Sequence, residues 1–209
     1  MPKEHKVKQG DCISSIAEIN GLFWEKIWNH PKNAKLKEKR KDPNILYPGD
    51  VVFVPEKEEK QESGATEQRH RFRQKGVPAK LCLQLKAGDE PLANISYILF
   101  IDGEVFSGVT DDDGKLKHHI PPNAMHGKVL VGENQEEYLL DLGQIDPIDQ
   151  VTGVQARLNN LGFDCGNVDG VPGPKTKAAI KEFQKQYDLT ESVEINQQTL
   201  EKLREVYGC

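Results

Sequence analysis

The chain has 209 residues, of which 36% are hydrophobic and 29% are charged, and its formal net charge is −5. This composition is ordinary for a globular protein and suffices for two or three small domains. No apolar run approaches the length of about 18 residues that a transmembrane helix needs. The N-terminal run MPKEHKVKQGD also lacks the apolar core of a secretory signal. We therefore expect a protein that is made in the cytoplasm and has no membrane partner.

Charge is distributed unevenly along the chain. Residues 1–55 carry ten Lys and Arg against seven Asp and Glu, a balance of +3, whereas residues 77–149 carry five against thirteen, a balance of −8. The acidic segment argues against nucleic acid as a partner. A basic cluster in the first segment is interpreted as a solvated loop, with a polyanion site as the alternative; it comprises Lys32, Lys35, Lys37, Lys39, Arg40 and Lys41.

Residues 1–55 have the pattern of a small α+β unit. We predict a strand over 5–8, a helix capped by Asp11, a second helix over 23–29 and a closing strand over 51–54. The second helix presents Trp24, Ile27 and Trp28 at i, i+3 and i+4. This spacing favours a core position for both tryptophans over a sugar-stacking role.

The spacing Val7-x-x-Gly10-Asp11-x-Ile13-x-x-Ile16-Ala17, followed by Tyr47-Pro48-Gly49 and Pro55, resembles the LysM domain. The resemblance implies that glycan containing N-acetylglucosamine binds in a shallow groove between the loop after the first strand and the loop before the second. Loop backbone amides and a small aliphatic patch suffice for an N-acetyl sugar, without any ionised group. The corresponding residues are Gly10, Asp11, Cys12, Ile13, Asn44, Ile45, Leu46 and Tyr47.

The sequence departs from the LysM pattern at two places. Cys12 stands where a hydroxyl residue is usual, and about ten additional, lysine-rich residues lie between Asn29 and Pro43. We expect this insertion to widen, cover or replace the sugar groove.

Residues 56–76 contain one large apolar residue and alternating charges, which predicts a flexible linker. The alternation of Arg69, Arg71 and Arg73 leaves open a first, edge strand of the next domain. From 77 to 146, apolar residues alternate between regularly spaced turn signals, which predicts an antiparallel β-sandwich of six or seven short strands.

Two strings in this middle segment, Pro91-Leu92-Ala93-x-x-x-Tyr97 and Gly108-x-Thr110-Asp111-x-x-Gly114, resemble transthyretin-like or carboxypeptidase-regulatory-like sandwiches. Such domains occur beside tip and effector proteins of type VI secretion and contractile injection systems. The resemblance implies that baseplate or tip proteins of such an apparatus are partners.

Residues 147–209 predict a bundle of three helices. Gly162 ends the first helix, Gly173-Pro174 opens the second, and Asn196 caps the third. The ordered run from Val154-Gln155 to Phe183-Gln184, with Asp169-Gly170 and Gly173 between them, resembles the peptidoglycan-binding domain type 1 family. The resemblance implies non-catalytic attachment to bacterial cell wall. We assign ligand contact to the hinge residues Asp169, Gly170 and Gly173, the alternative being that the glycines serve only the turn.

No motif predicts catalysis, a metal site or a cofactor. An EF-hand loop starting at Asp111 would need Glu where Pro122 stands, and the three nearby histidines (His118, His119 and His126) form no ordered ligand set. Cys12, Cys82, Cys165 and Cys209 are interpreted as reduced thiols, with a Cys165–Cys209 bridge left open. Spacing alone leaves open a paired-carboxylate glycosidase.

The sequence therefore predicts an α+β multidomain protein in four segments: a βααβ LysM-like domain (1–55), a linker (56–76), a β-sandwich (77–146) and a three-helix peptidoglycan-binding domain (147–209). We expect a non-enzymatic protein that binds peptidoglycan at the cell wall, in the periplasm or within an exported injection particle. One alternative is a structural or cargo-adaptor component in which both end domains dock protein. A cell-wall hydrolase is the other alternative.

Overall fold

The computed structural model describes residues 2–57, 66–67, 69, 79–88 and 90–207. The chain divides into two compact units: Met1–Asn44 with Pro48–Gln144, and Ile45–Tyr47 with Ile145–Cys209. The predicted α+β fold class is confirmed, with several antiparallel sheets and six α-helices in the described residues. The four-segment division stays a prediction, and most of the predicted linker, including Arg71 and Arg73, lies outside the described residues. None of the described helices is both long and apolar enough to cross a membrane.

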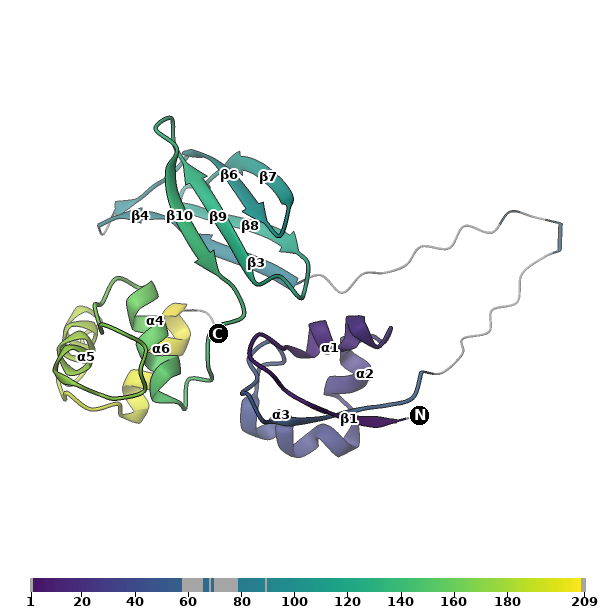
Figure 1. Cartoon of the computed structure of the whole chain (residues 1–209). Helices are drawn as coiled ribbons and strands as arrows, with labels where there is room; N and C mark the ends of the chain where they lie inside the picture. Colours follow the sequence, from purple (N-terminus) through teal and green to yellow (C-terminus); the bar gives the residue numbers. More distant parts are fainter. Residues whose placement is uncertain (1, 58–65, 68, 70–78, 89, 208–209) are drawn as a thin grey trace. The chain divides into compact units, whose positions relative to one another are not determined.

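A two-stranded antiparallel sheet and two short helices open the chain (Figure 1). Strand β1 (Lys3–Lys6) pairs with β2 (Val51–Val54), so the first strand lies two residues earlier than predicted. Helices α1 (Ile13–Ile19) and α2 (Trp24–Trp28) carry the apolar residues of the core. As predicted, Trp28 is buried with Ile27, while Trp24 is half-buried. A core this small buries little apolar surface, so the domain also depends on hydrogen bonds and ion pairs between its elements.

The lysine-rich insertion is helical, so its interpretation as a loop is wrong, although its lysine side chains are exposed as expected. A 3-10 turn, η1 (Pro31–Asn33), leads into α3 (Ala34–Arg40). The helix buries one apolar residue, Leu36, and the side chain of Arg40. A single apolar residue gives no helical periodicity, which is why the sequence pattern does not reveal the helix.

The middle of the chain is all β. A four-stranded antiparallel sheet has the order β10-β9-β6-β7, and β3 pairs with β8 and β4 with β5. Leu81 of β3 and Leu116 of β8 share one core with Leu99 of β6 and Val129 of β9, as the predicted sandwich requires. The strands are β3 (Ala79–Gln84), β4 (Lys86–Ala87), β5 (Glu90–Pro91), β6 (Ser96–Ile101), β7 (Glu104–Val109), β8 (Lys115–Ile120), β9 (His126–Val131) and β10 (Glu136–Asp141).

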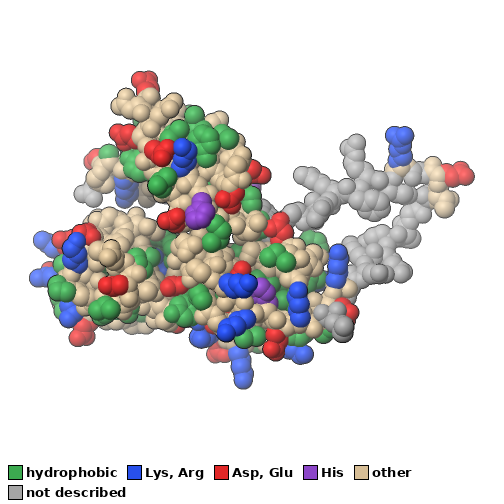
Figure 2. Space-filling view, in the orientation of Figure 1, with side chains coloured by type: hydrophobic (Ala, Val, Ile, Leu, Met, Phe, Trp, Pro, Cys, Tyr) green, Lys and Arg blue, Asp and Glu red, His purple; other side chains and the backbone are tan. Residues whose placement is uncertain are grey.

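The outer face of the four-stranded sheet is unusually apolar. In the strand register, Phe100 lies opposite Val105 and Lys128, and Lys128 lies opposite Leu139. Val105 and Leu139 are 61% and 78% exposed, and hydrophobic side chains gather on this domain in Figure 2. An exposed apolar patch of this kind is typical of an interaction surface.

Three helices form the C-terminal domain: α4 (Val151–Asn160), α5 (Pro174–Gln186) and α6 (Gln197–Tyr207). The predicted boundaries are confirmed, because Gly162 has a φ of 92°, Pro174 opens α5, and the Asn196 side chain accepts the backbone N–H of Thr199 at 2.9 Å. Leu158, Ile180, Phe183 and Leu203 are fully buried in the core between the helices.

Candidate functional site

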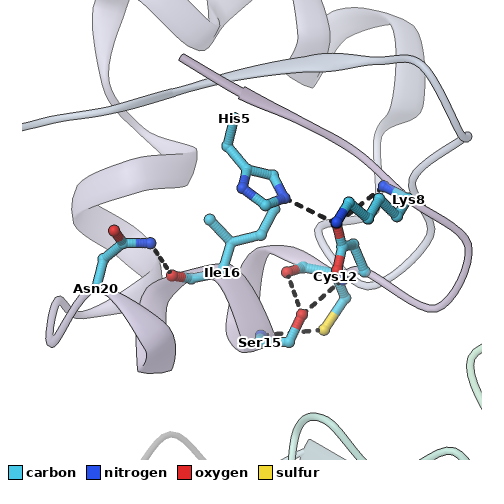
Figure 3. Close-up of polar contacts among 7 residues, drawn as sticks. His5, Lys8, Cys12, Ser15, Ile16 and Asn20 are labelled. Atoms are coloured by element: carbon cyan, nitrogen blue, oxygen red, sulfur yellow. Dashed lines mark hydrogen bonds and ion pairs between the residues drawn. The ribbon is translucent and has the colours of Figure 1, made fainter. Parts of the chain in front are cut away.

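The loop before α1 is held by a carboxylate. Asp11 Oδ2 lies 2.8 Å from His5 Nε2 and accepts the backbone N–H of Lys8 at 2.9 Å (Figure 3). Gly10 has a φ of 85°, a conformation that glycine adopts without strain. Asp11 therefore fixes the loop, although the sequence predicts it as the helix cap.

Cys12 is the cap of α1. The backbone N–H of Ser15 points to Cys12 Sγ at 3.3 Å, and Ser15 Oγ accepts the backbone N–H of Cys12 at 2.9 Å. Sulfur thus fills the place of a hydroxyl oxygen in a reciprocal capping box. The side chains of Cys12 and Ile13 are buried, so a ligand at these positions would contact backbone atoms.

The loop after β1 meets the segment that follows α3 through the backbone. The Ile13 N–H donates to the Pro43 carbonyl at 2.9 Å, and the N–H of Asn44, which is exposed, donates to Asp42 Oδ1 at 2.7 Å. The structure thus places Ile13 beside the residue that precedes Asn44, and the groove itself stays a prediction. Ile45, Leu46 and Tyr47 are grouped with the second compact unit, and their part in the groove stays a prediction.

Two polar side chains of the insertion bind β2 and the residue that precedes it. Asn33 pairs with both backbone groups of Phe53, donating to its carbonyl and accepting its N–H, each at 2.8 Å. Arg40 forms a two-pronged ion pair with Asp50 at 2.6 and 3.0 Å, and both side chains are buried. The insertion is therefore an integral part of this domain.

Lysine side chains of the insertion remain at the surface, and Figure 2 shows basic side chains spread over this domain. Lys32 Nζ lies 4.3 Å from the centre of the Phe53 ring, and His30 stacks on the same ring at 4.5 Å. The Phe53 ring is thus occupied by the protein's own cation and imidazole.

In the C-terminal domain, one buried glutamine organises the predicted hinge. Gln155 Nε2 lies 3.0 Å from Asp169 Oδ1, 3.1 Å from the Val171 carbonyl oxygen and 3.0 Å from Thr176 Oγ1. Its Oε1 accepts the backbone N–H of Gly170 at 2.9 Å. The hinge is therefore fixed from inside the bundle.

A second buried glutamine repeats this arrangement one helix later. Gln184 Nε2 lies 2.9 Å from Thr199 Oγ1 and 3.4 Å from the Glu194 carbonyl oxygen, and its Oε1 accepts the backbone N–H of Ser192 at 2.6 Å. Gln155 and Gln184 are 1% and 0% exposed. Each interhelical loop of the bundle is thus held by one glutamine and by a threonine in the first turn of the following helix.

The hinge residues assigned to ligand contact differ in their structural roles. Gly170 has a φ of 76°, whereas Gly173 has a φ of −73° and precedes α5 as its N-cap. Hydrogen bonds from the Gln155 side chain and the Val171 backbone lower the pKa of Asp169 below its ordinary value of 3.8. Gly170 therefore serves the turn, while Asp169 is a fixed, ionised carboxylate at the surface.

Comparison with known protein families gives two matches. Residues 5–55 match the LysM domain model, and residues 147–203 match the peptidoglycan binding domain model. The chain carries a LysM domain and a peptidoglycan-binding domain. The comparison with curated proteins and the comparison with solved structures each found no match. The two domains support peptidoglycan binding by this protein and action at the cell wall.

Sequence reasoning missed the buried polar side chains that hold the insertion and the interhelical loops in place. In the LysM domain these are Asn33 and Arg40, which lie in the insertion. In the peptidoglycan-binding domain they are Gln155 and Gln184. The signal for the glutamines was present, because each follows a core residue directly, as Val154-Gln155 and Phe183-Gln184, and precedes a threonine at the start of the next helix. Polar residues in such a repeated register are candidates for buried hydrogen-bonding groups.

The acidic run and the histidines of the middle segment make contacts that serve the fold. Asp111 Oδ1 accepts the backbone N–H groups of Asp113 and Lys115, as expected for a hairpin turn, and His118 Nε2 lies 2.7 Å from the Tyr97 hydroxyl. No group of three or more potential metal ligands occurs in the part of the chain that the structure describes. Burial raises the pKa of the Cys165 thiol to about 11, and Cys165 forms no disulfide within the described residues. Cys209 lies outside them, so the predicted alternative of a Cys165–Cys209 bridge stays open.

Proposed function

We propose that this protein is a non-catalytic peptidoglycan-binding protein that engages the wall at two places. The LysM domain takes glycan containing N-acetylglucosamine between residues 10–13 and 44–47, and the C-terminal domain holds a second part of the same polymer. The observation that carries this proposal is the presence of two different wall-binding domain families in one chain.

The loop geometry supports sugar binding through the backbone. Cys12 and Ile13 turn their side chains inward, while the loop around them is fixed by Asp11 and by the Ile13–Pro43 hydrogen bond. A preorganised loop reduces the ordering cost of binding a neutral sugar. The acetamido group of the ligand supplies one donor, one acceptor and a methyl group.

Two modest sites on one chain give firm attachment when both are engaged. Linking two binding modules raises overall affinity by roughly 10²- to 10⁴-fold over a single site when both can reach the same polymer. Peptidoglycan presents its repeating unit many times, so a second site is always near the first.

The electrostatics of the C-terminal hinge suit neither Asp164 nor Asp169 to the role of a general acid. Hydrogen bonds lower the pKa of Asp169, and the Gly166 backbone N–H together with Lys175 lowers the pKa of Asp164. A general acid in a glycosidase needs the opposite, a carboxyl group whose pKa is raised so that it carries a proton near neutral pH. Both carboxylates are ionised and act as acceptors for the protein's own N–H groups.

The proposal is tested by co-sedimentation of the full chain with purified sacculi, combined with analysis of the supernatant. We expect the chain to pellet, soluble oligomers of N-acetylglucosamine to compete, and no muropeptides or new reducing ends to appear. Ile45→Asp and Asn44→Ala should weaken the competition by the oligomers. Release of soluble wall fragments would show instead that the protein is a hydrolase.

A second candidate function is favoured by the apolar outer face of the β-sandwich. Val105, Val109 and Leu139 are 60–78% exposed on that sheet, which fits a protein contact better than a sugar contact. We propose as the alternative a structural or cargo-adaptor role in a contractile injection or type VI secretion apparatus. In that case Val105→Lys and Leu139→Lys would abolish incorporation into such a particle, and sacculus binding would be absent in the wild-type chain.

A further inference from the structure

The peptidoglycan-binding domain contains a small cleft beside the hinge. It has a volume of about 250 Å³ and lies between the loop that precedes α5 and the loop that precedes α6. Its wall is mostly aliphatic, and one lysine and one glutamate belong to it. The lining residues are Pro172, Lys177, Ile180, Val193, Glu194 and Ile195.

The two buried glutamines hold opposite sides of this cleft. Gln155 bonds the Val171 carbonyl, next to Pro172, and Gln184 bonds the backbone on either side of Val193. Because both sides are fixed by buried hydrogen bonds, the cleft exists before any ligand arrives. A preformed site binds a small ligand with less loss of conformational freedom.

The charged groups of the cleft are available to a ligand. Lys177 and Glu194 are exposed, and neither side chain has a hydrogen bond or an ion pair within the described residues. Val193 is 46% exposed, whereas Ile180 is fully buried. The cleft therefore offers aliphatic contact, one cation and one anion, and it has no aromatic platform.

We propose that this cleft binds the short stem peptide of peptidoglycan and not its glycan; this inference rests on the function proposed above. A neutral sugar has no charge to pair with Lys177 or with Glu194, whereas a short peptide carries both a carboxylate and an amino group. A peptide of small residues presents methyl groups to the aliphatic wall. Its carboxylate pairs with Lys177 and its amino group with Glu194. The two end domains then bind different chemical parts of one polymer, the glycan and the stem peptide.

The test is a titration of the ¹⁵N-labelled full chain, followed by amide resonances. One probe is the synthetic peptide L-Ala-γ-D-Glu-L-Lys-D-Ala-D-Ala, and the other is the tetramer of N-acetylglucosamine, each at millimolar concentration. We expect the peptide to shift amides of residues 171–180 and 193–196, and the sugar tetramer to leave them unchanged. Lys177→Glu should weaken peptide binding by about tenfold or more, because it places like charges together, and Val193→Asp should do the same.

Lys175→Glu is the matched control, since it makes the same charge change on α5 at a residue that does not line the cleft. All three positions are exposed, so the variants should keep the fold. Unchanged peptide binding in both cleft variants overturns the inference. The inference is also overturned if the sugar tetramer, and not the peptide, shifts the amides of residues 171–180 and 193–196, but the proposed function survives that result. If neither the peptide nor the sugar tetramer shifts any amide of the chain, and the wild-type chain also fails to pellet with sacculi, the proposed function is overturned as well.

Discussion

The LysM domain and the peptidoglycan-binding domain both contain a buried amide side chain that binds backbone groups, Asn33 in one and Gln155 in the other, but they differ in the side chains that act beside it. The LysM domain uses a charged pair, Arg40 with Asp50, to anchor an inserted helix. The helical domain uses two neutral glutamines in equivalent positions. A buried ion pair is costly to break because one charge is left without a partner, whereas a lost amide leaves only dipoles unsatisfied. The two domains should therefore differ in how much stability one truncation removes.

The largest effect is expected for Arg40→Ala. Removing the guanidinium leaves the Asp50 carboxylate buried and without its main partner, which should destabilise the LysM domain by about 3–5 kcal/mol. Both tryptophans of the chain, Trp24 and Trp28, lie in this domain, so urea unfolding followed by tryptophan fluorescence reports it alone.

Lys39→Ala is the control for this experiment. Lys39 Nζ lies 3.7 Å from Asp50 Oδ1, but its side chain is 59% exposed, so its loss should cost less than about 1 kcal/mol. Equal costs for Arg40→Ala and Lys39→Ala would mean that the buried pair does not anchor the insertion.

Gln155→Ala should destabilise the C-terminal domain by about 2–3 kcal/mol, since it leaves the Gly170 N–H and the Val171 carbonyl without their side-chain partner. Gln184→Ala should cost a similar amount if the two arrangements are equivalent. Amide hydrogen exchange of peptides from residues 147–207 measures both losses, and exposed Gln198→Ala is the control. A cost for either variant as large as that of Arg40→Ala would contradict the difference between the domains.

The same substituent at the two hinge glycines should give different results. Gly170→Ser places a side chain at a φ of 76° and should cost about 1–2 kcal/mol. Gly173 has a φ of −73°, and a Cβ added there would meet only the Val171 carbonyl oxygen, at 4.0 Å. Serine is also a good N-cap, so Gly173→Ser should change stability by less than about 0.5 kcal/mol. Thermal unfolding monitored by hydrogen exchange checks the pair, and equal losses would show that both glycines serve the turn.

The smallest effect concerns pH. Because the folded-state pKa of Asp169 lies below its ordinary value of 3.8, its contribution is present at neutral pH and is lost as pH falls below that ordinary value and through the lowered pKa. Asp169→Asn should therefore flatten the acid limb of the stability curve of the C-terminal domain and leave the LysM domain unaffected. An identical acid limb in wild type and variant would contradict this.

Apolar periodicity and turn residues predicted most of the fold. The three C-terminal helices end or begin at Gly162, Pro174 and Asn196, because these residues act through local backbone chemistry that the sequence carries. The same holds for the closing strand β2, where four consecutive apolar residues follow a turn.

Features that depend on contacts between residues far apart in the sequence were not predicted. Helix α3 has one buried apolar residue, and its last residue, Arg40, binds Asp50 across a turn. The side chains that hold the insertion and the interhelical loops are polar and buried. Ordinary rules place such residues at the surface unless a partner is known. Knowledge of the repeated Gln–Thr pairing would have located both loops of the helical domain.

The most direct test of two-site binding is a set of sacculus-pelleting isotherms for the full chain. The set comprises wild type, Ile45→Asp in the LysM domain, Lys177→Glu in the C-terminal domain, and the double variant. We predict that each single variant pellets about tenfold or more weakly than wild type and that the double variant does not pellet above a control without sacculi. Pelleting of the double variant with wild-type affinity, or no pelleting of the wild-type chain, would contradict it.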